Sequence, residues 1–263
     1  MDNANNLPIG FFDSGVGGLS VLARFREVFP SENFLYFGDT AHLPYGNKSK
    51  VELVGYAKNI LNFMQKKGVK AVVIACNTSS AQAYDVIKDS YPFKIYPIIQ
   101  CCAKTVGEKY NRVGVFATEA TVKSGKYTEE LTKANPKIKV KEMASKDWVG
   151  IVEGVGENID EARKHIKYEL NEMLEFKPEK IILGCTHYPY LMNEFVKYAD
   201  ESLFIDPAKI FVNYIKEDLE KRELINFSKN TTPQEQFYVS SSPEEFVKNA
   251  KIFYELKELP LLV

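Results

Sequence analysis

The chain has 263 residues, of which 45% are hydrophobic and 26% are charged, and its formal net charge is −1. This length allows one large domain or two small ones, and the composition is that of an ordinary globular protein. The near-zero charge gives no electrostatic reason to expect nucleic acid or a membrane surface as a partner. No signal peptide or apolar membrane span is visible, and four cysteines are too few for a disulfide framework. We therefore expect a cytoplasmic protein.

Strands and helices alternate along the first half of the chain. Short apolar runs predict buried strands, and apolar residues at helical spacing predict helices between them. The expected strands cover residues 7–12, 33–39, 72–75 and 94–99, and the expected helices cover residues 19–29, 49–66 and 79–89. This alternation predicts a doubly wound parallel sheet with right-handed crossovers.

A second series of the same kind begins at Arg112. The expected strands cover 112–118, 137–144, the run that ends at Cys185, and 202–206, with helices at 119–134 and 157–176. A helix from Pro207 to about residue 219, a polar loop through Thr232, a strand at 236–241 and a helix from Pro243 follow. The fold class is therefore α/β, with two halves that each contain a mainly parallel sheet flanked by helices.

A cysteine ends one predicted strand in each half. Cys76 follows the apolar run in KAVVIACNTSS (residues 70–80), and Cys185 follows the one in EKIILGCTHYP (residues 179–189). Open α/β sheets bind their ligands at the carboxyl ends of their strands. A cysteine at a helix N-terminus also has its pKa lowered below about 8.5 by the helix dipole. The two sequences look like one type of site built twice.

Two thiols on opposite sides of one bound molecule could form a redox disulfide, bind a metal, act as an acyl-transfer nucleophile, or exchange a proton. Redox pairs are usually closely spaced, and zinc needs more ligands than the sequence offers at a suitable spacing. Acyl transfer needs one nucleophile and would leave the second thiol without a task. Proton exchange at a stereocentre needs a base on one face and an acid on the other. Racemisation is the leading interpretation.

The loop DSGVGG (residues 13–18) resembles a dinucleotide fingerprint but lacks its third glycine, because Ser20 stands at that position. Its glycines suit a sharp turn that aims N–H groups into a cleft, as a small carboxylate requires, although a plain strand-to-helix turn is an equal alternative. The loop Pro44-Tyr45-Gly46 follows a strand, and its alternative reading is a rigid surface loop.

Short polar residues flank both thiols. Asn77, Thr78 and Thr186 offer donors and acceptors, and they could equally cap helices. His187 could polarise the Cys185 thiol or orient a substrate, although most lone histidines do neither. Cys101 and Cys102 lie at an expected strand-to-helix junction, where we expect them to be small buried residues without a chemical role.

The motifs FDSGVGGLSVL, YFGDTAHLPYGNKS, IACNTSSA, TVKSG and LGCTHYP, in this order, resemble those of the bacterial glutamate racemases. The resemblance covers the chain from Ile9 to about Asp206. It implies a cofactor-independent enzyme, with no metal, that interconverts L-glutamate and D-glutamate and supplies D-glutamate for peptidoglycan. It also implies two α/β domains with the active site between them, the first comprising residues 1–99 and 208–263 and the second residues 100–207. A homodimer is the expected assembly.

The resemblance also assigns residues. Cys76 and Cys185 are implied to be the two acid/base thiols, with Asp13 near Cys76, His187 near Cys185, and a further acid at Glu153. The implied substrate contacts are Asp13, Ser14, Tyr45, Gly46, Asn77, Thr78, Thr121, Thr186 and His187. Three alternative functions remain: a racemase acting on aspartate or another amino acid, a cysteine hydrolase with a single nucleophile, and a non-catalytic amino-acid-binding protein.

Overall fold

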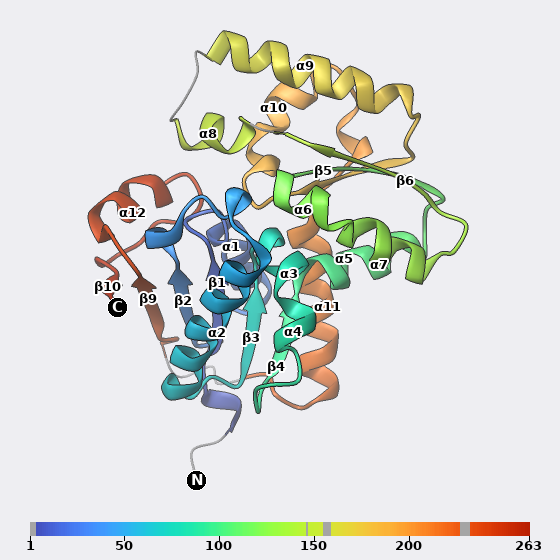
Figure 1. Ribbon diagram of the computed structural model, residues 1–263. Coiled ribbons are helices and arrows are strands. Elements are labelled where there is room, and N and C mark those ends of the chain that lie inside the picture. The colour runs from blue at the N-terminus through green and yellow to red at the C-terminus, as the bar shows by residue number, and fades with distance from the viewer. Residues whose placement is uncertain (1–3, 146, 155–158, 227–231) are drawn as a thin grey trace.

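The computed structural model describes residues 4–145, 147–154, 159–226 and 232–263, which form two parallel sheets (Figure 1). The larger sheet has the strand order β10-β9-β2-β1-β3-β4, and the smaller one has the order β6-β5-β7-β8. All strand pairings in the described residues are parallel, and helices cover the sheets. The prediction of an α/β protein with two helix-flanked parallel sheets is confirmed.

The larger sheet combines strands from the start and the end of the chain. Its strands are β1 (Ile9–Asp13), β2 (Phe34–Gly38), β3 (Ala71–Ile74), β4 (Lys94–Pro97), β9 (Glu235–Val239) and β10 (Leu261–Leu262). Phe11 on the central strand β1 lies opposite Tyr36 on β2 and Val73 on β3. β9 pairs with β2, so the C-terminal segment completes this sheet. The assignment of residues 1–99 and 208–263 to one domain, and of 100–207 to the other, stays a prediction.

Helices cover both faces of the larger sheet. They are α1 (Leu19–Val28), α2 (Lys50–Lys67), α3 (Asn77–Gln82), α4 (Tyr84–Ile87), α5 (Ile98–Gly107), α11 (Pro207–Lys221) and α12 (Pro243–Ala250). Because successive residues of a strand face opposite sides, Phe11 packs in one core with α1 and α11, and Phe12 packs in another with α2. A capping box formed by Ser49 and Glu52 begins α2, and Gly68, at φ 72°, ends it.

The smaller sheet consists of β5 (Arg112–Ala117), β6 (Lys139–Ala144), β7 (Lys180–Gly184) and β8 (Phe204–Ile205). Its helices are α6 (Glu119–Ser124), α7 (Lys126–Ala134), α8 (Trp148–Glu153), α9 (Ile159–Glu175) and α10 (Met192–Phe195). α9 crosses one face of this sheet, and α5 and α7 contact each other on the other (Figure 1). The core that contains α5 therefore continues from one sheet into the other. No helix in the described part of the chain is long and apolar enough to span a bilayer.

The first half of the chain departs from the predicted boundaries at two sites. The strand expected at 94–99 ends at Pro97, and Ile98 already begins α5. Cys101 and Cys102 consequently lie within a helix rather than at a junction. The helix expected at 79–89 begins at Asn77 and is divided at Ala83 into α3 and α4. Apolar β-branched residues at a helix start imitate a strand, which explains the first error.

The second half departs mainly through short elements. Gly125, at φ 62°, divides the helix expected at 119–134 into α6 and α7, because this left-handed conformation cannot continue a helix. The strand expected at 202–206 is limited to β8, and α8 and β10 were not predicted. Glu157, the expected start of a helix, lies outside the described residues, as do residues 227–231 of the expected polar loop.

Candidate active site

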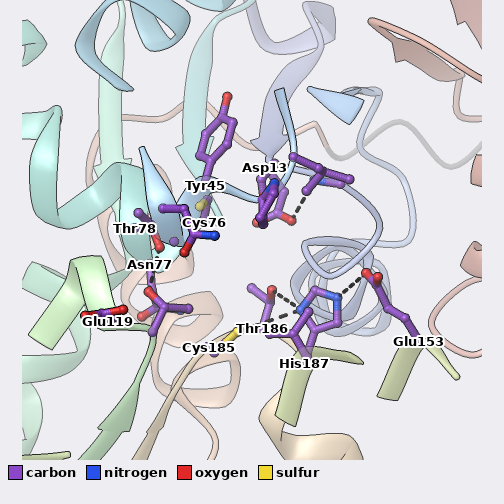
Figure 2. Close-up of a pocket in the computed structure, with 18 of the residues that line it drawn as sticks. Asp13, Tyr45, Cys76, Asn77, Thr78, Glu119, Glu153, Cys185, Thr186 and His187 are labelled. Carbon is purple, nitrogen blue, oxygen red and sulfur yellow. Dashed lines mark hydrogen bonds and ion pairs between the residues drawn. The ribbon is translucent and has the colours of Figure 1, made fainter. Parts of the chain in front are cut away.

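The carboxyl ends of strands from both sheets meet around one cavity of about 630 Å³. Asp13 is the last residue of β1, Cys76 follows β3 and Cys185 follows β7. Figure 2 shows Cys76 beside Asn77 and Thr78, and Cys185 beside Thr186 and His187. The lining residues are Asp13, Ser14, Gly15, Leu43, Pro44, Tyr45, Gly46, Asn47, Cys76, Asn77, Thr78, Thr118, Glu119, Ser145, Val149, Glu153, Cys185, Thr186 and His187.

Cys76 is buried at the N-terminus of α3. The residue is 5% exposed, and its Sγ accepts a hydrogen bond from the Ser79 N–H at 3.4 Å. Burial raises the pKa of the Cys76 thiol to about 12, with a further contribution from the negative charge of Asp13, and the Ser79 N–H opposes this only in part. The predicted lowering of the Cys76 pKa is therefore wrong. The six-residue helix α3 supplies a dipole whose effect is smaller than the cost of burying a thiolate.

Cys185 lies next to a histidine–glutamate pair. The Cys185 Sγ is 3.7 Å from the Nδ1 of His187, and the His187 Nε2 is 2.9 Å from an Oε1 of Glu153. Burial alone would lower the pKa of His187, but its hydrogen bonds and charge interactions with Cys185 and Glu153 outweigh burial and raise this pKa to about 10. The raised pKa favours the protonated form of His187, whose Nδ1 lies against the sulfur of Cys185.

Helix α8 brings Glu153 to His187. Trp148, at the start of α8, is fully buried and its ring packs against Phe116 and Tyr188. Glu153 is the last residue of this helix and lies on the far side of His187 from Cys185 (Figure 2). The buried tryptophan thus fixes the helix whose other end holds the carboxylate.

Asp13 is close enough to both Cys76 and His187 for its charge to affect them. Its side chain is 1% exposed, and its Oδ2 accepts a hydrogen bond from the Gly15 N–H at 3.2 Å, while Oδ1 has no partner among the described residues. Burial raises the pKa of Asp13, and the nearby His187 counteracts this shift. Asp13 also raises the pKa of Cys76 through its charge. Its carboxylate therefore acts on both thiol environments, although the sequence predicted proximity to Cys76 alone.

The glycines of the DSGVGG loop allow this loop to pack directly against the second half of the site. A Cβ on Gly17 would lie 2.3 Å from the Oγ1 of Thr186 and 2.4 Å from the Cε1 of His187. A Cβ on Gly18 would lie 2.5 Å from the Cβ of Asp13. All three distances are shorter than real Cβ contacts, so these positions require glycine. The loop therefore packs closely against Thr186 and His187 and is more than a plain turn.

Polar groups from the two halves hydrogen-bond to each other directly beside the cavity. The Asn77 Oδ1 accepts a hydrogen bond of 2.7 Å from the hydroxyl of Tyr127, and its Nδ2 is buried without a partner among the described residues. Thr78 Oγ1 is 3.0 Å from the hydroxyl of Thr118 and 3.3 Å from that of Thr121. Thr121 is fully buried behind the wall, so it supports Thr78 and Thr118 and does not line the cavity itself.

The remaining predicted residues also surround the cavity. Ser14 and Gly46 line it, and the Oγ1 of Thr186 is 3.4 Å from the Nδ1 of His187. Tyr45 is buried beside Cys76, but its hydroxyl donates to the Oδ2 of Asp39. The Tyr45 ring therefore shapes the wall, while its hydroxyl is engaged with Asp39.

Several lining residues did not follow from the sequence reasoning. Thr118 and Glu119 come directly after β5, so the rule that placed the two cysteines at strand ends could have identified them. Ser145 follows β6 in the same way. Leu43, Asn47 and Val149 carry no recognisable signal, because they reach the cavity through loop and helix packing. Within the described residues, no group of three or more His, Cys, Asp or Glu side chains could hold a metal ion.

The arrangement provides one proton donor or acceptor on each side of a cavity large enough for an amino acid. The Cys76 side holds a neutral thiol, and the Cys185 side holds a thiol next to the imidazole of His187. Donors and acceptors for charged groups surround the space between them. Such a site can remove a proton from one face of a bound molecule and deliver one to the other face.

Comparison with known proteins gives a consistent result. Residues 20–215 match the family described as Asp/Glu/Hydantoin racemase. Glutamate racemase 2 of Caldanaerobacter subterraneus is 40% identical over 249 residues, covering 93% of this chain and 92% of the relative. Glutamate racemase of Picosynechococcus is 36% identical over 253 residues, covering 95% and 90%. The solved structure of glutamate racemase from Francisella tularensis with D-glutamate has a TM-score of 0.87 at 32% identity, covering 98% of both chains. The chain belongs to the Asp/Glu/hydantoin racemase family.

Proposed function

We propose that this chain is a glutamate racemase that interconverts L-glutamate and D-glutamate by acid/base chemistry between Cys76 and Cys185. The observation that carries the proposal is the placement of two strand-end thiols, one from each sheet, on the same cavity. The extensive similarity to glutamate racemases supports glutamate as the substrate.

In one direction the Cys185 thiolate removes the α-proton of glutamate, so that an S–H bond forms as the Cα–H bond breaks. The electron pair left on Cα then takes a proton from the Cys76 thiol on the opposite face, which leaves Cys76 as a thiolate. In the reverse direction Cys76 is the base and Cys185 is the acid. No net proton is consumed, and the configuration at Cα is inverted.

The surroundings of the thiols suit this assignment. The pKa of about 12 keeps Cys76 protonated at neutral pH, as an acid must be, and His187, whose pKa is raised to about 10, lies 3.7 Å from the sulfur of Cys185. An α-proton beside an ionised carboxylate is only weakly acidic, so the site must also stabilise negative charge that develops on the substrate. The residues that we assign to binding the carboxylates and the ammonium group are Ser14, Gly46, Asn77, Thr78 and Thr186, with Thr121 supporting Thr78.

We propose that D-glutamate made by this enzyme enters peptidoglycan synthesis. We also propose that the enzyme works in the cytoplasm and needs no cofactor. A homodimer is the proposed assembly.

The decisive experiment follows the α-hydrogen in heavy water. Protein that has been dialysed against a chelator, with no pyridoxal phosphate added, is incubated with L-glutamate in D₂O. We expect the α-proton signal and the optical rotation to disappear together, and the same with D-glutamate. The Cys76→Ala/Cys185→Ala double variant is the control. Faster exchange with aspartate, a burst of acyl-enzyme with an ester substrate, or binding without exchange would each replace this proposal with one of the alternative functions.

A further inference from the structure

The buried amide of Asn77 makes a hydrogen bond that crosses between the two halves of the site. Asn77 begins α3 beside the larger sheet, and its partner Tyr127 lies in the first turn of α7 beside the smaller sheet. The Tyr127 ring is fully buried against the end of β7, where a Cβ on Gly184 would lie 2.9 Å from its Cε2. Glycine immediately before Cys185 therefore makes room for this ring.

The hydrogen bond determines which way the Asn77 amide faces. Burial raises the pKa of the Tyr127 hydroxyl well above its usual value, so this group keeps its proton and must donate it. Its described partner is the Oδ1 of Asn77 at 2.7 Å. If the amide were turned over, its NH₂ group could donate to the Tyr127 oxygen, but the buried hydroxyl proton would lose its acceptor. The oxygen of the Asn77 amide is thus engaged with Tyr127, and the NH₂ group is the end that can face the cavity.

We propose that Tyr127 is a positioning residue that holds the Asn77 amide with its NH₂ group toward the substrate, and so makes Asn77 a donor for a substrate carboxylate. This inference rests on the proposed function, and it identifies a residue outside the cavity lining. The Asn77 Nδ2 is buried with no partner among the described residues, so it awaits an acceptor. In glutamate only the carboxylates accept hydrogen bonds, because the ammonium group can only donate. An amide held in this orientation therefore discriminates between the two kinds of substrate group.

The test is a double-mutant cycle with Tyr127→Phe and Asn77→Ala. Tyr127→Phe keeps the ring but removes the hydroxyl, so the amide can rotate and turn its carbonyl toward the carboxylate. We expect KM for both enantiomers of glutamate to rise about tenfold, as for the loss of one hydrogen bond to a charged group, with kcat changing much less. Asn77→Ala should raise KM by a similar factor. In the Asn77→Ala background, Tyr127→Phe should change KM by less than about twofold, since its effect passes through the amide.

Two further variants separate positioning from a general loss of structure. Tyr96→Phe is the matched control, because the Tyr96 hydroxyl is also buried and donates to the Oδ2 of Asp218 at 2.7 Å, away from the cavity. It should leave KM unchanged. Asn77→Asp keeps an acceptor for Tyr127 but has no NH₂ group, so it should raise KM while its melting temperature stays near that of the wild type. This variant tests the donor role even if Tyr127→Phe fails to fold.

Each outcome has a defined meaning. Unchanged KM in Tyr127→Phe, or effects of Tyr127→Phe and Asn77→Ala that multiply, would overturn the positioning role while wild-type racemisation stands. A KM for Asn77→Asp equal to that of the wild type would overturn the donor role. A wild-type chain that does not racemise glutamate would overturn the proposed function and this inference together.

Discussion

The two thiols occupy equivalent positions at strand ends but have different surroundings. Cys76 is buried with one backbone N–H as its hydrogen-bond partner and has the negative charge of Asp13 nearby. Cys185 lies 3.7 Å from a histidine that Glu153 holds from the other side. Burial and a like charge disfavour a thiolate at Cys76, whereas the imidazole of His187 lies beside Cys185. Position on the fold therefore decides where the two thiols point, and the ionisable groups beside each thiol differ.

This difference assigns unequal roles to two halves of similar construction. In the proposed mechanism Cys76 is the acid and Cys185 is the base in one direction, and the two exchange these roles in the other. One turnover of the proposed mechanism leaves the thiolate at Cys76, where burial and the charge of Asp13 disfavour it. The comparison predicts that changes on the two sides affect the two directions of the reaction differently.

The largest effect is expected from removing either thiol. Cys76→Ala and Cys185→Ala should each reduce racemisation by about 10³-fold or more, because inversion needs both an acceptor and a donor. A single remaining base should still remove one proton, so each variant should eliminate HCl from one enantiomer of a chlorinated glutamate. The circular dichroism of glutamate measures the loss of racemisation, and chloride release measures the elimination of HCl. Racemisation near the wild-type rate in either variant would mean that the two thiols do not act as a pair.

Asp13→Asn and His187→Gln should each reduce turnover by about 10²-fold and reveal which thiol each residue serves. The two enantiomers have equal free energy, so kcat/KM must fall equally in both directions. Any asymmetry must therefore appear in kcat and KM separately, or in the isotope effect with α-deuterated substrate. We expect Asp13→Asn to raise the isotope effect mainly when Cys76 is the base, and His187→Gln mainly when Cys185 is the base.

The position of Asp13 near both sides limits that asymmetry. Because its charge also acts on His187, Asp13→Asn should be less selective between the two directions than His187→Gln. Equal losses with unchanged isotope effects in both variants would leave these residues as substrate-binding groups only.

Glu153→Gln tests the histidine–glutamate pair beside Cys185, and we expect it to lower kcat about tenfold. The folded-state pKa of His187 is raised from 6.5 to about 10, so its protonation stabilises the fold fully below pH 6.5, and this contribution is lost as the pH rises through about 10. Glu153→Gln should lower this pKa and reduce the free energy of unfolding by about 1–2 kcal/mol at pH 7. The difference between variant and wild type should disappear near pH 10. Urea unfolding at both pH values measures it, and a difference that does not depend on pH would contradict the pairing.

Much of this site could be predicted because strand ends leave clear signals in a sequence. The apolar runs before Cys76 and Cys185 predicted buried strands, and the topology of parallel sheets placed both cysteines at the cavity. The charge environment of each thiol was less accessible. The pKa of Cys76 depends on burial and on Asp13, which is distant in sequence, and the helix dipole alone gave the wrong direction.

The structure around Glu153 and Tyr127 shows where sequence reasoning is weakest. Helix α8 is six residues long, and its position depends on Trp148 packing against Phe116 and Tyr188, which are remote in sequence. The bond from Tyr127 to Asn77 joins two sheets across 50 positions. Neither the position of α8 nor the Tyr127–Asn77 hydrogen bond can be predicted from a local sequence pattern. The prediction at the start of α5 was wrong for the opposite reason, because there the local pattern was misleading. Its adjacent isoleucines are apolar, as a buried strand would be, but they begin a helix.

The smallest effect is expected for the two cysteines of α5, which serve as a reference for thiols outside the site. Cys101 and Cys102 are buried, burial raises the pKa of both, and neither lines the cavity that contains Cys76 and Cys185. Cys101→Ala and Cys102→Ala should each change kcat/KM by less than about twofold and lower the free energy of unfolding by about 0.5–1.5 kcal/mol, because a sulfur leaves a small cavity. Steady-state kinetics and urea unfolding measure the two quantities. A tenfold loss of activity in Cys102→Ala at unchanged stability would mean that α5, which lies in the core shared by the two sheets, transmits its packing to the thiols, and the comparison between Cys76 and Cys185 would then have to include it.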